Sequence, residues 1–227
     1  MAGLRERKKE QTRRRIAEVA LRLFAERGYD AVTVNEVAEA AGVAKVTLFS
    51  YFPSKESLAL EGVKDDMARV VAERAPGVTP LAALRAHYRG LAAGGAGEVD
   101  VEALLARVRV ISSSPALLAG LQQSYAEERE ELSAALATSA TSATSAKRAT
   151  SAASAASPVP EGEVDLVARV MAAQITATVT ALQETFFFRL SCGTPLAEAG
   201  RRLAEDVELA FDLLEHGHGH VDDKDGS

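Results

Sequence analysis

The stretch that decides the fold is TVNEVAEAAGVAKVTLFSYF, residues 33–52, which has the pattern of two short helices joined by a tight turn. Apolar residues recur at i, i+3, i+4 and i+7 in its first half, so one helix face can be buried. Thr33 and Glu36 have the spacing of a capping box. Gly42 follows the last periodic residue, where a left-handed backbone suits a residue without a Cβ. The stretch predicts a helix-turn-helix, although a helical hairpin in an α-helical core would have the same pattern.

The second helix of the pair is expected from Ala44 to about Phe52, with Leu48 and Phe52 spaced for burial. Pro53 would stop this helix and Ser54 could cap the next one. The remaining faces of the second helix carry polar side chains that can meet DNA, namely Lys45, Thr47, Ser50 and Tyr51.

Two segments close to this stretch extend the pattern, LFAERGY at 23–29 and TLFSYFPSKESL at 47–58. Together with the basic helix before them, they closely resemble the DNA-binding domain of the TetR family of bacterial transcriptional regulators, over about the first quarter of the chain. The resemblance implies an all-α protein, and the helical periodicity along the chain predicts about nine helices. An N-terminal three-helix helix-turn-helix domain would be joined to a larger helical domain for ligand binding and dimerisation.

The same resemblance implies which residues contact DNA. The expected set is Thr33, Ala44, Lys45, Val46, Thr47, Phe49, Ser50, Tyr51 and Lys55. Lys45, Thr47 and Ser50 would face the major groove, whereas Thr33, Tyr51 and Lys55 would hold phosphates. Many relatives have Ser, Gly and Tyr at the positions of Ala44, Val46 and Phe49. Ala44 therefore lacks the hydroxyl that would cap the helix, Val46 has a side chain where a glycine would let the backbone approach DNA closely, and Phe49 lacks the hydroxyl that would bind a phosphate.

Positive charge is concentrated near the N-terminus of the chain, as expected for a segment that binds DNA. The chain has a net charge of −6, but residues 1–60 hold 11 Lys and Arg against 8 Asp and Glu, whereas residues 61–227 hold 15 against 24. Much of the positive charge lies before residue 16, and Arg13, Arg14 and Arg15 are expected near the DNA backbone. Residues 1–9 are equally compatible with a disordered leader and with an arm that contacts DNA.

The predicted organisation has a DNA-binding domain at 9–60 and a helical ligand-binding and dimerisation domain at 61–217. A continuous helix from about residue 56 to about residue 74 would leave the first domain. Residues 138–160 are rich in Thr, Ser and Ala and hold no large apolar side chain until Val159, so burial cannot offset the ordering entropy and a loop is expected. Residues 218–227 are expected to be a disordered tail.

The resemblance further implies a small-molecule cavity in the second domain. Residues that could line it are His87, Tyr88, Arg107, Gln122, Tyr125, Gln183 and Phe187. The competing interpretation is that aromatic residues at helical spacing are core. SPALLAGL at 114–121 and LAED at 203–206 are similar to family members that bind acyl-CoA-like ligands. The expected effector is thus small and largely apolar, its identity is unknown, and an acyl-CoA-like molecule is one candidate.

The last two predicted helices, about 161–190 and 195–216, each have a broad apolar stripe. In the family they form a four-helix bundle with the same pair of a second subunit, which implies a homodimer. The expected interface consists of Val179, Leu182, Leu203, Val207, Phe211 and Leu214.

Other classes of protein find little support in the sequence. We recognise no catalytic motif, cofactor loop or paired-cysteine zinc spacing, so no enzyme activity, cofactor or metal site is predicted. HGHGH at 216–220 would bind metal only adventitiously, and Cys192 is the sole cysteine, which fits a reducing cytoplasm. No membrane span is expected, because charged residues interrupt the apolar region near residues 164–190. The expected function is that of a cytoplasmic, dimeric, ligand-responsive repressor on a palindromic operator in double-stranded DNA. An effector-independent DNA-binding protein and an enzyme are the alternatives.

Overall fold

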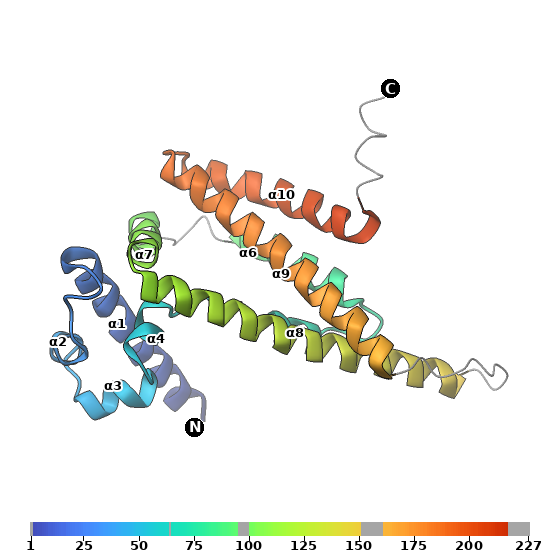
Figure 1. Cartoon of the computed structure of the whole chain (residues 1–227), viewed down its shortest axis with the longest axis horizontal. Helices are drawn as coiled ribbons and strands as arrows, with labels where there is room; N and C mark the ends of the chain where they lie inside the picture. Colours follow the sequence, from blue (N-terminus) through green and yellow to red (C-terminus); the bar gives the residue numbers. More distant parts are fainter. Residues whose placement is uncertain (1, 64, 95–99, 151–160, 218–227) are drawn as a thin grey trace. The chain divides into compact units, whose positions relative to one another are not determined.

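The computed structural model of the chain describes all residues except 1, 64, 95–99, 151–160 and 218–227. The described part of the chain is all-helical, with ten helices and no strand (Figure 1). The helices belong to two compact units. The first unit comprises Met1–Lys64 and Asp100–Ser124, and the second comprises Asp65–Val99 and Tyr125–Ser227. Residues 100–124, which the sequence assigned to the second domain, are therefore part of the first unit.

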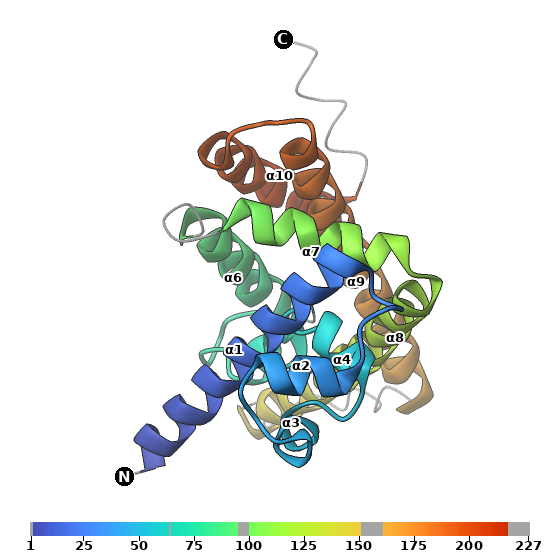
Figure 2. The ribbon, with the colours of Figure 1, turned by 90° about the vertical axis from the view of Figure 1, so that its left-hand side faces the viewer.

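The first unit is built on α1, which contacts α2, α4 and α7. Figure 2 shows α1 with α2, α3 and α4 close by. The helices are α1 (Ala2–Arg27), α2 (Val34–Ala40), α3 (Lys45–Tyr51), α4 (Lys55–Ala59), α7 (Val101–Ser113) and the beginning of α8 (Pro115–Thr150). Their shared core includes Ile16, Phe24, Leu48, Phe52 and Leu58, each at most 2% exposed. The helix-turn-helix of the sequence is thus fixed on the long first helix.

The second unit packs α10 against α6 and α9. Its helices are α5 (Met67–Ala72), α6 (Pro80–Gly94), the rest of α8, α9 (Glu161–Ser191) and α10 (Leu196–His216). The core includes Met67, Leu84, Ile175, Val207 and Phe211. Between α9 and α10 the chain turns at Gly193, whose φ is +83°, and the neighbouring Cys192 is exposed.

The helix expected from about residue 56 to about 74 is interrupted. The structure has α4 and α5 in its place, separated by a segment in which Gly62 adopts a φ of +72°. Leu60 and Val63 pack on the core of the first unit, whereas Met67 and Val71 are buried in the core of the second. An uninterrupted helix was the wrong prediction because these apolar residues belong to two different cores. This break accounts for one helix more than the expected number.

Two further boundaries differ from the sequence analysis. The first helix begins at Ala2, so residues 2–9, which the sequence left open between a disordered leader and an arm that contacts DNA, are helical. α8 continues to Thr150, into the segment 138–160 that was expected to be a loop. Alanine is the best helix former, Ser and Thr cost at most about 0.7 kcal/mol per residue relative to it, and no Gly or Pro follows Gly120 until Pro158. The rest of the expected loop, 151–160, and the expected tail, 218–227, lie outside the described residues.

One described helix by itself, over Asp165–Ser191 in α9, is long and apolar enough to cross a membrane, with a mean hydropathy of 1.2. A third of its apolar window is buried, and Ala172, Ile175 and Val179 lie in the core of the second unit. The core helix of a soluble protein passes the same test, so the absence of a membrane span stays a prediction.

Candidate DNA interface and effector pocket

The helix-turn-helix begins with the capping box that the sequence predicted. The Thr33 hydroxyl accepts a hydrogen bond of 3.3 Å from the Glu36 backbone N–H, and Oε2 of Glu36 accepts one of 2.7 Å from the Thr33 backbone N–H. Nη2 of Arg27 lies 2.7 Å from the other Glu36 oxygen. The backbone bond from Thr33, followed by the Thr33 hydroxyl and Arg27, lowers the pKa of Glu36 to about 2.

The turn between α2 and α3 is fixed by Gly42, whose φ is +65°. Its N–H donates to the Glu39 carbonyl at 3.0 Å, and the Val43 N–H donates to the Ala38 carbonyl at 3.0 Å. A residue with a Cβ would be strained in this left-handed conformation. The prediction that Gly42 ends the first helix is therefore confirmed.

α3 buries one side and exposes the other. Leu48 in the helix and Phe52 directly after it are fully buried, which fixes how the helix is rotated on the core. The exposed residues are Ala44, Lys45, Val46, Thr47, Phe49 and Ser50. Val46 is 82% exposed, and Nζ of Lys45 lies 5.9 Å from the centroid of the Phe49 ring. Ala44 occupies the N-cap and supplies no side-chain cap.

Several of the residues expected to contact DNA have partners within the protein. The Thr33 hydroxyl donates to Glu36 at 2.7 Å, and the Ser50 hydroxyl donates to the Thr47 carbonyl at 2.6 Å. Nζ of Lys55 lies 4.1 Å from the centroid of the Tyr29 ring. Tyr51 is half-buried. Lys45 and Thr47 are thus presented directly to solvent, whereas Thr33 and Ser50 would have to exchange a hydrogen bond to meet DNA.

Arg13, expected near the DNA backbone, has a structural role. Its guanidinium forms an ion pair with Glu61, with Nη2 of Arg13 2.6 Å from Oε2, and Nη1 donates to the Tyr51 carbonyl at 3.0 Å. The hydrogen bond to Glu61 raises the pKa of Arg13. The guanidinium also lies 4.7 Å from the centroid of the Phe52 ring. Arg13 therefore holds α1 against the end of α3, and Arg14 and Arg15 are the exposed cations of this stretch.

A pocket of about 130 Å³ lies within the second unit, between α6, α9 and α10. It is lined by Asp65, Tyr88, Leu91, Val179, Leu182, Gln183, Phe186, Phe187, Leu203 and Val207. The Tyr88 hydroxyl donates to Oδ2 of Asp65 at 2.9 Å, and Nε2 of Gln183 donates to the same oxygen at 3.0 Å. The pocket thus has apolar walls and one polar cluster.

The structure brings together only part of the expected ligand set. Tyr88, Gln183 and Phe187 line the pocket. His87 is outside the lining, with its ring centroid 5.2 Å from that of Tyr88, and Tyr125 is half-buried in the second unit. Asp65 was not among the expected ligand residues, because residue 65 was expected inside a continuous helix and no local motif marks it.

Arg107 and Gln122 belong to the first unit and are not among the residues that line this pocket. Nη1 of Arg107 donates to the Glu61 carbonyl at 2.6 Å, and burial lowers the pKa of Arg107. Their assignment to one ligand site with Tyr88 and Gln183 therefore has no support from this pocket. The first unit has its own larger groove, of about 830 Å³ between α1 and α7, in which charged residues of both signs, including Arg22, Glu26 and Arg109, take part in the lining.

The expected dimer contacts are mostly core residues. Val179, Leu182, Val207 and Phe211 are at most 7% exposed within one chain, and they pack in the core of the second unit. Leu203 and Leu214 are half-buried against the same core. A residue already buried in its own chain has no surface for a partner, so the assignment of the four buried residues was wrong. Most of the apolar residues that α9 exposes follow one stripe, Leu166, Val170, Ala173, Ala177, Ala181 and Phe188, called the α9 stripe below, and Val167 is exposed beside it.

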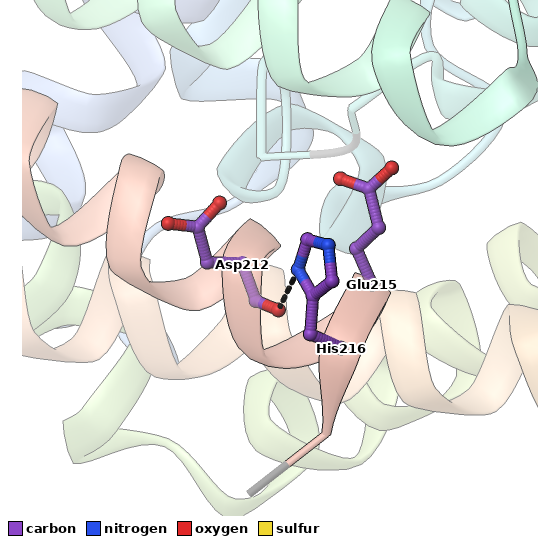
Figure 3. A group of neighbouring side chains, drawn as sticks. All are labelled: Asp212, Glu215 and His216. Carbon is purple, nitrogen blue, oxygen red and sulfur yellow. Dashed lines mark hydrogen bonds between the residues drawn. The ribbon is translucent and has the colours of Figure 1, made fainter. Parts of the chain in front are cut away.

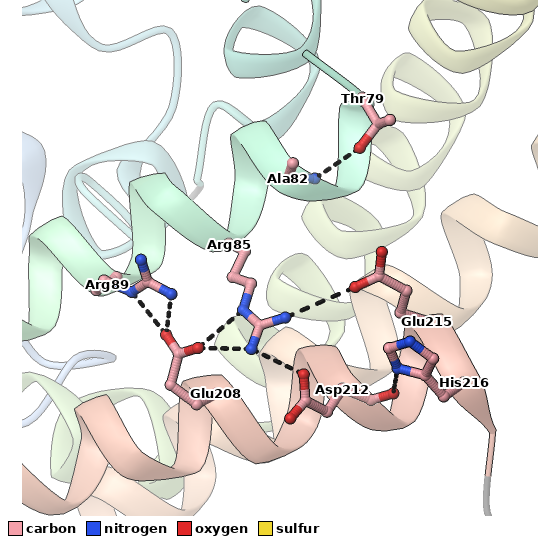
Figure 4. Close-up of polar contacts among 8 residues, drawn as sticks. All are labelled: Thr79, Ala82, Arg85, Arg89, Glu208, Asp212, Glu215 and His216. Carbon is pink, nitrogen blue, oxygen red and sulfur yellow. Dashed lines mark hydrogen bonds and ion pairs between the residues drawn. The ribbon is translucent and has the colours of Figure 1, made fainter. Parts of the chain in front are cut away.

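α6 and α10 are joined by ion pairs on Arg85 (Figure 4). Nη2 of Arg85 lies 2.6 Å from Glu208 and 2.8 Å from Asp212, and Nη1 lies 3.6 Å from Glu215. Arg89 shares Glu208 at 2.6 Å. The Arg85 hydrogen bond is the main cause that lowers the pKa of Glu208. This network fixes the two helices that flank the pocket.

Asp212, Glu215 and His216 form a group whose potential metal-ligand atoms lie within 4.8 Å of one another (Figure 3). Two of the three are carboxylates that already pair with Arg85, and Nδ1 of His216 lies 3.2 Å from the Asp212 carbonyl oxygen. The group has a structural explanation as the end of the α6–α10 network. His218 and His220 lie outside the described residues.

Comparisons with known proteins agree on one family. Residues 16–61 match the family model described as "Bacterial regulatory proteins, tetR family". The HTH-type transcriptional regulator TcmR of Streptomyces glaucescens is 33% identical over 142 residues, 60% of this chain and 61% of that protein. MftR of Mycobacterium tuberculosis, named as a mycofactocin biosynthesis transcriptional regulator, is 32% identical over 141 residues, 58% of this chain and 67% of that protein. The match to TcmR thus spans about three fifths of its length.

The fold also has a solved counterpart. The structure of GusR from Salmonella enterica superposes with a TM-score of 0.51 at 19% identity, over 90% of this chain and 96% of that one. At this identity the likeness concerns the fold alone. It covers both units and not merely the residues of the helix-turn-helix.

Proposed function

The chain belongs to the TetR family of bacterial regulatory proteins, and we propose that it is a dimeric, cytoplasmic repressor of transcription that a small, largely apolar effector releases from a palindromic operator. The single observation that carries this proposal is α3, a short helix that buries Leu48 and presents Lys45, Val46 and Thr47 to solvent. A helix fixed on its core in this way can enter a major groove, where side chains can reach the base edges.

The α9 stripe supports the proposal that the chain forms a homodimer. Its small residues Ala173, Ala177 and Ala181 allow a second helix to approach closely, and Leu166, Val170 and Phe188 supply apolar area. A two-fold dimer places two identical recognition helices in opposite senses, so the operator should be an inverted repeat. The interface proposed here uses the exposed side of α9 in place of the buried residues expected from the sequence.

The pocket beside Asp65 supports an effector site in the second unit. Its walls are mainly Leu, Val and Phe, in keeping with an apolar ligand. A volume of about 130 Å³ is well below the roughly 300–1,000 Å³ of pockets that hold drug-sized ligands. An acyl-CoA-like effector therefore finds no support in this pocket, and a much smaller molecule fits better.

The effector can act only through different affinities for the DNA-competent and incompetent forms. Shifting a population from 1:99 to 99:1 needs about 5.5 kcal/mol, more than the typical single-site coupling of about 1–3 kcal/mol. Two equivalent sites in a dimer could supply this jointly. We propose no enzymatic activity, because the relatives are named as regulators of transcription.

Footprinting of the purified protein on genomic DNA tests the proposal. The expected result is protection of an inverted repeat at a few promoters, and the neighbouring genes would indicate the effector. Protection without sequence preference would favour the alternative of an effector-independent DNA-binding protein. Calorimetry should then show that operator DNA weakens effector binding. The factor should equal the one by which the effector weakens DNA binding, because the coupling between two binding sites is reciprocal.

A further inference from the structure

The pocket has one charged residue among the ten that line it, and that residue is the acid Asp65. The two hydrogen bonds that Asp65 accepts, from Tyr88 and Gln183, both go to Oδ2. Its other oxygen, Oδ1, accepts no hydrogen bond from the part of the chain that the structure describes. A carboxylate with one oxygen anchored and one available is suited to accept a hydrogen bond from a ligand.

The surroundings of Asp65 favour a cation over an anion. Burial raises the pKa of the Asp65 carboxyl, whereas the Tyr88 hydrogen bond, the charge of His87 and the Gln183 hydrogen bond lower it, and burial is the largest of these effects. Burial and then Asp65 raise the pKa of Tyr88, and a second acid, Glu128, which is 3% exposed, adds a smaller effect in the same direction. Among the residues that the structure describes, no Lys or Arg lines the pocket. A negatively charged ligand would thus meet like charge in a partly desolvated site, whereas a cation would compensate the half-buried carboxylate of Asp65.

The size of the pocket limits the apolar part of the ligand. An engineered, apolar-lined cavity of roughly 150 Å³ in another protein is known to hold benzene. The pocket here is slightly smaller, at about 130 Å³, with Phe186 and Phe187 on its wall. One aromatic or aliphatic ring fits this space, with a polar group reaching toward Asp65.

We propose that the effector is a small amine with a single apolar ring, whose ammonium group donates a hydrogen bond to Oδ1 of Asp65 while the ring lies against Phe186 and Phe187. The inference rests on the proposed function, since it assigns the chemical class of the effector at that site. Tyr88 and Gln183 hold the carboxylate in place by their bonds to Oδ2. The negative charge of Asp65 selects for an amine, and the small volume of the pocket excludes larger amines.

Calorimetry of the full-length protein with three probes of similar size tests the charge preference. Benzylamine is cationic at neutral pH, benzyl alcohol is neutral and benzoate is anionic. The affinity of benzylamine should exceed that of benzyl alcohol by a factor of about 10 or more, as expected for a hydrogen bond to a charged partner. Benzoate should bind most weakly. Benzoate binding as tightly as benzylamine would overturn the inference.

Substitutions assign the preference to Asp65. Asp65→Asn should reduce benzylamine affinity about 10-fold and leave benzyl alcohol nearly unchanged. Asp66→Asn is the matched control, because Asp66 is exposed and pairs with Arg69 at 2.7 Å outside the pocket. An Asp65→Asn protein that keeps the wild-type ranking of the probes would sink the proposal.

A second pair of variants covers the case in which Asp65→Asn does not fold. Leu91 lines the pocket and is 51% exposed, so Leu91→Lys can bring an ammonium group to Asp65 without disturbing the core. This variant should lose benzylamine binding, whereas Leu91→Met should retain it. Unchanged benzylamine binding in Leu91→Lys would count against the site.

Operator affinity measured in the same samples separates this inference from the proposed function. An amine that binds at Asp65 and weakens operator binding supports both. Operator binding that no amine affects overturns the inference and leaves the DNA-binding regulator in place. A protein that binds no specific DNA contradicts the proposed function, whatever it binds in the pocket.

Discussion

The guanidinium of Arg13 in α1 and the carboxylate of Glu61, two residues past the end of α4, form a two-point ion pair, with Nη2 of Arg13 2.6 Å from Oε2. The same guanidinium donates to the Tyr51 carbonyl at the end of α3. One side chain from a basic stretch therefore joins three parts of the first unit. The positive charge of Arg13 thus stabilises the fold, whereas the exposed Arg14 and Arg15 remain available to contact DNA.

Replacing Arg13 should affect stability first. Arg13→Ala should lower the free energy of unfolding by about 1 kcal/mol, a modest value because both partners are partly exposed, and the melting temperature should fall. Arg15→Ala is the control, since Arg15 is exposed on the same helix. The Arg15→Ala protein should melt like wild type. If Arg15 contacts a phosphate, this variant should bind DNA more weakly, and the slope of log binding constant against log salt concentration should become shallower by about 1. Wild-type melting of Arg13→Ala would contradict the structural role.

Lys45 should contribute to sequence readout. If it binds a guanine, Lys45→Ala should cost about 1–3 kcal/mol on the cognate operator and should relax specificity at one base pair. Fluorescence anisotropy on cognate and random duplexes at fixed salt would measure both effects. Equal losses on the two duplexes would instead identify Lys45 as a phosphate contact.

The capping box predicts a pH dependence for the helix-turn-helix. The pKa of Glu36 is about 2 in the folded protein, against an ordinary value of 4.5. Because the folded pKa is the lower one, the stabilisation is fully present above pH 4.5 and is lost as the pH falls toward 2. The difference in melting temperature between wild type and Glu36→Gln should shrink over this window.

The pKa itself can be followed by the ¹³C shift of the Glu36 carboxyl group. Arg27→Gln removes the ion pair to Glu36 and should raise this pKa part of the way toward its ordinary value. Titration of Glu36 near 4.5 in the wild-type protein would show that the cap does not form in solution.

The α9 stripe can be tested with matched substitutions of valine. Val170→Glu, at an exposed position of the stripe, should weaken dimerisation and operator binding together while leaving the fold intact. Val78→Glu is the control, because Val78 is exposed in the loop before α6. Sedimentation and circular dichroism would separate association from folding. A dimeric Val170→Glu protein would rule out the stripe as the interface.

The network on Arg85 should stabilise the second unit. Arg85→Ala would leave Glu208, Asp212 and Glu215 close together on α10 without their shared partner, so we expect a loss of about 1–2 kcal/mol that diminishes with added salt. Arg89→Ala removes a more exposed contact to Glu208 alone and should cost less. Urea unfolding at low and high salt would measure the difference. Equal effects of the two substitutions would argue against a central role for Arg85.

Local sequence patterns were sufficient for the helix-turn-helix. The Thr33 and Glu36 pair, the glycine at 42 and the spacing of Leu48 and Phe52 each report on contacts within a few residues, and the structure confirms all of them. The Arg13–Glu61 pair and the Tyr88–Asp65 bond join residues 48 and 23 positions apart. No local pattern encodes such contacts, and so Arg13 was misplaced and Asp65 missed.

The dimer residues were misassigned for a different reason. α9 is apolar on most of its circumference, with Ile175 and Val179 on one side and Val170 and Ala177 on the other. Helical periodicity shows that such a helix has two apolar faces but cannot say which one the chain itself covers. That choice depends on the packing of α6 and α10, which only the three-dimensional structure reveals.

Cys192 gives this protein a practical property. The thiol is exposed in the turn between α9 and α10 and is the sole cysteine of the sequence. A spin label or fluorophore can therefore be attached at one known site without further engineering. In a two-fold assembly the two labels would define a single distance between subunits, and a shift in that distance on adding amine or operator would report the conformational change as it occurs.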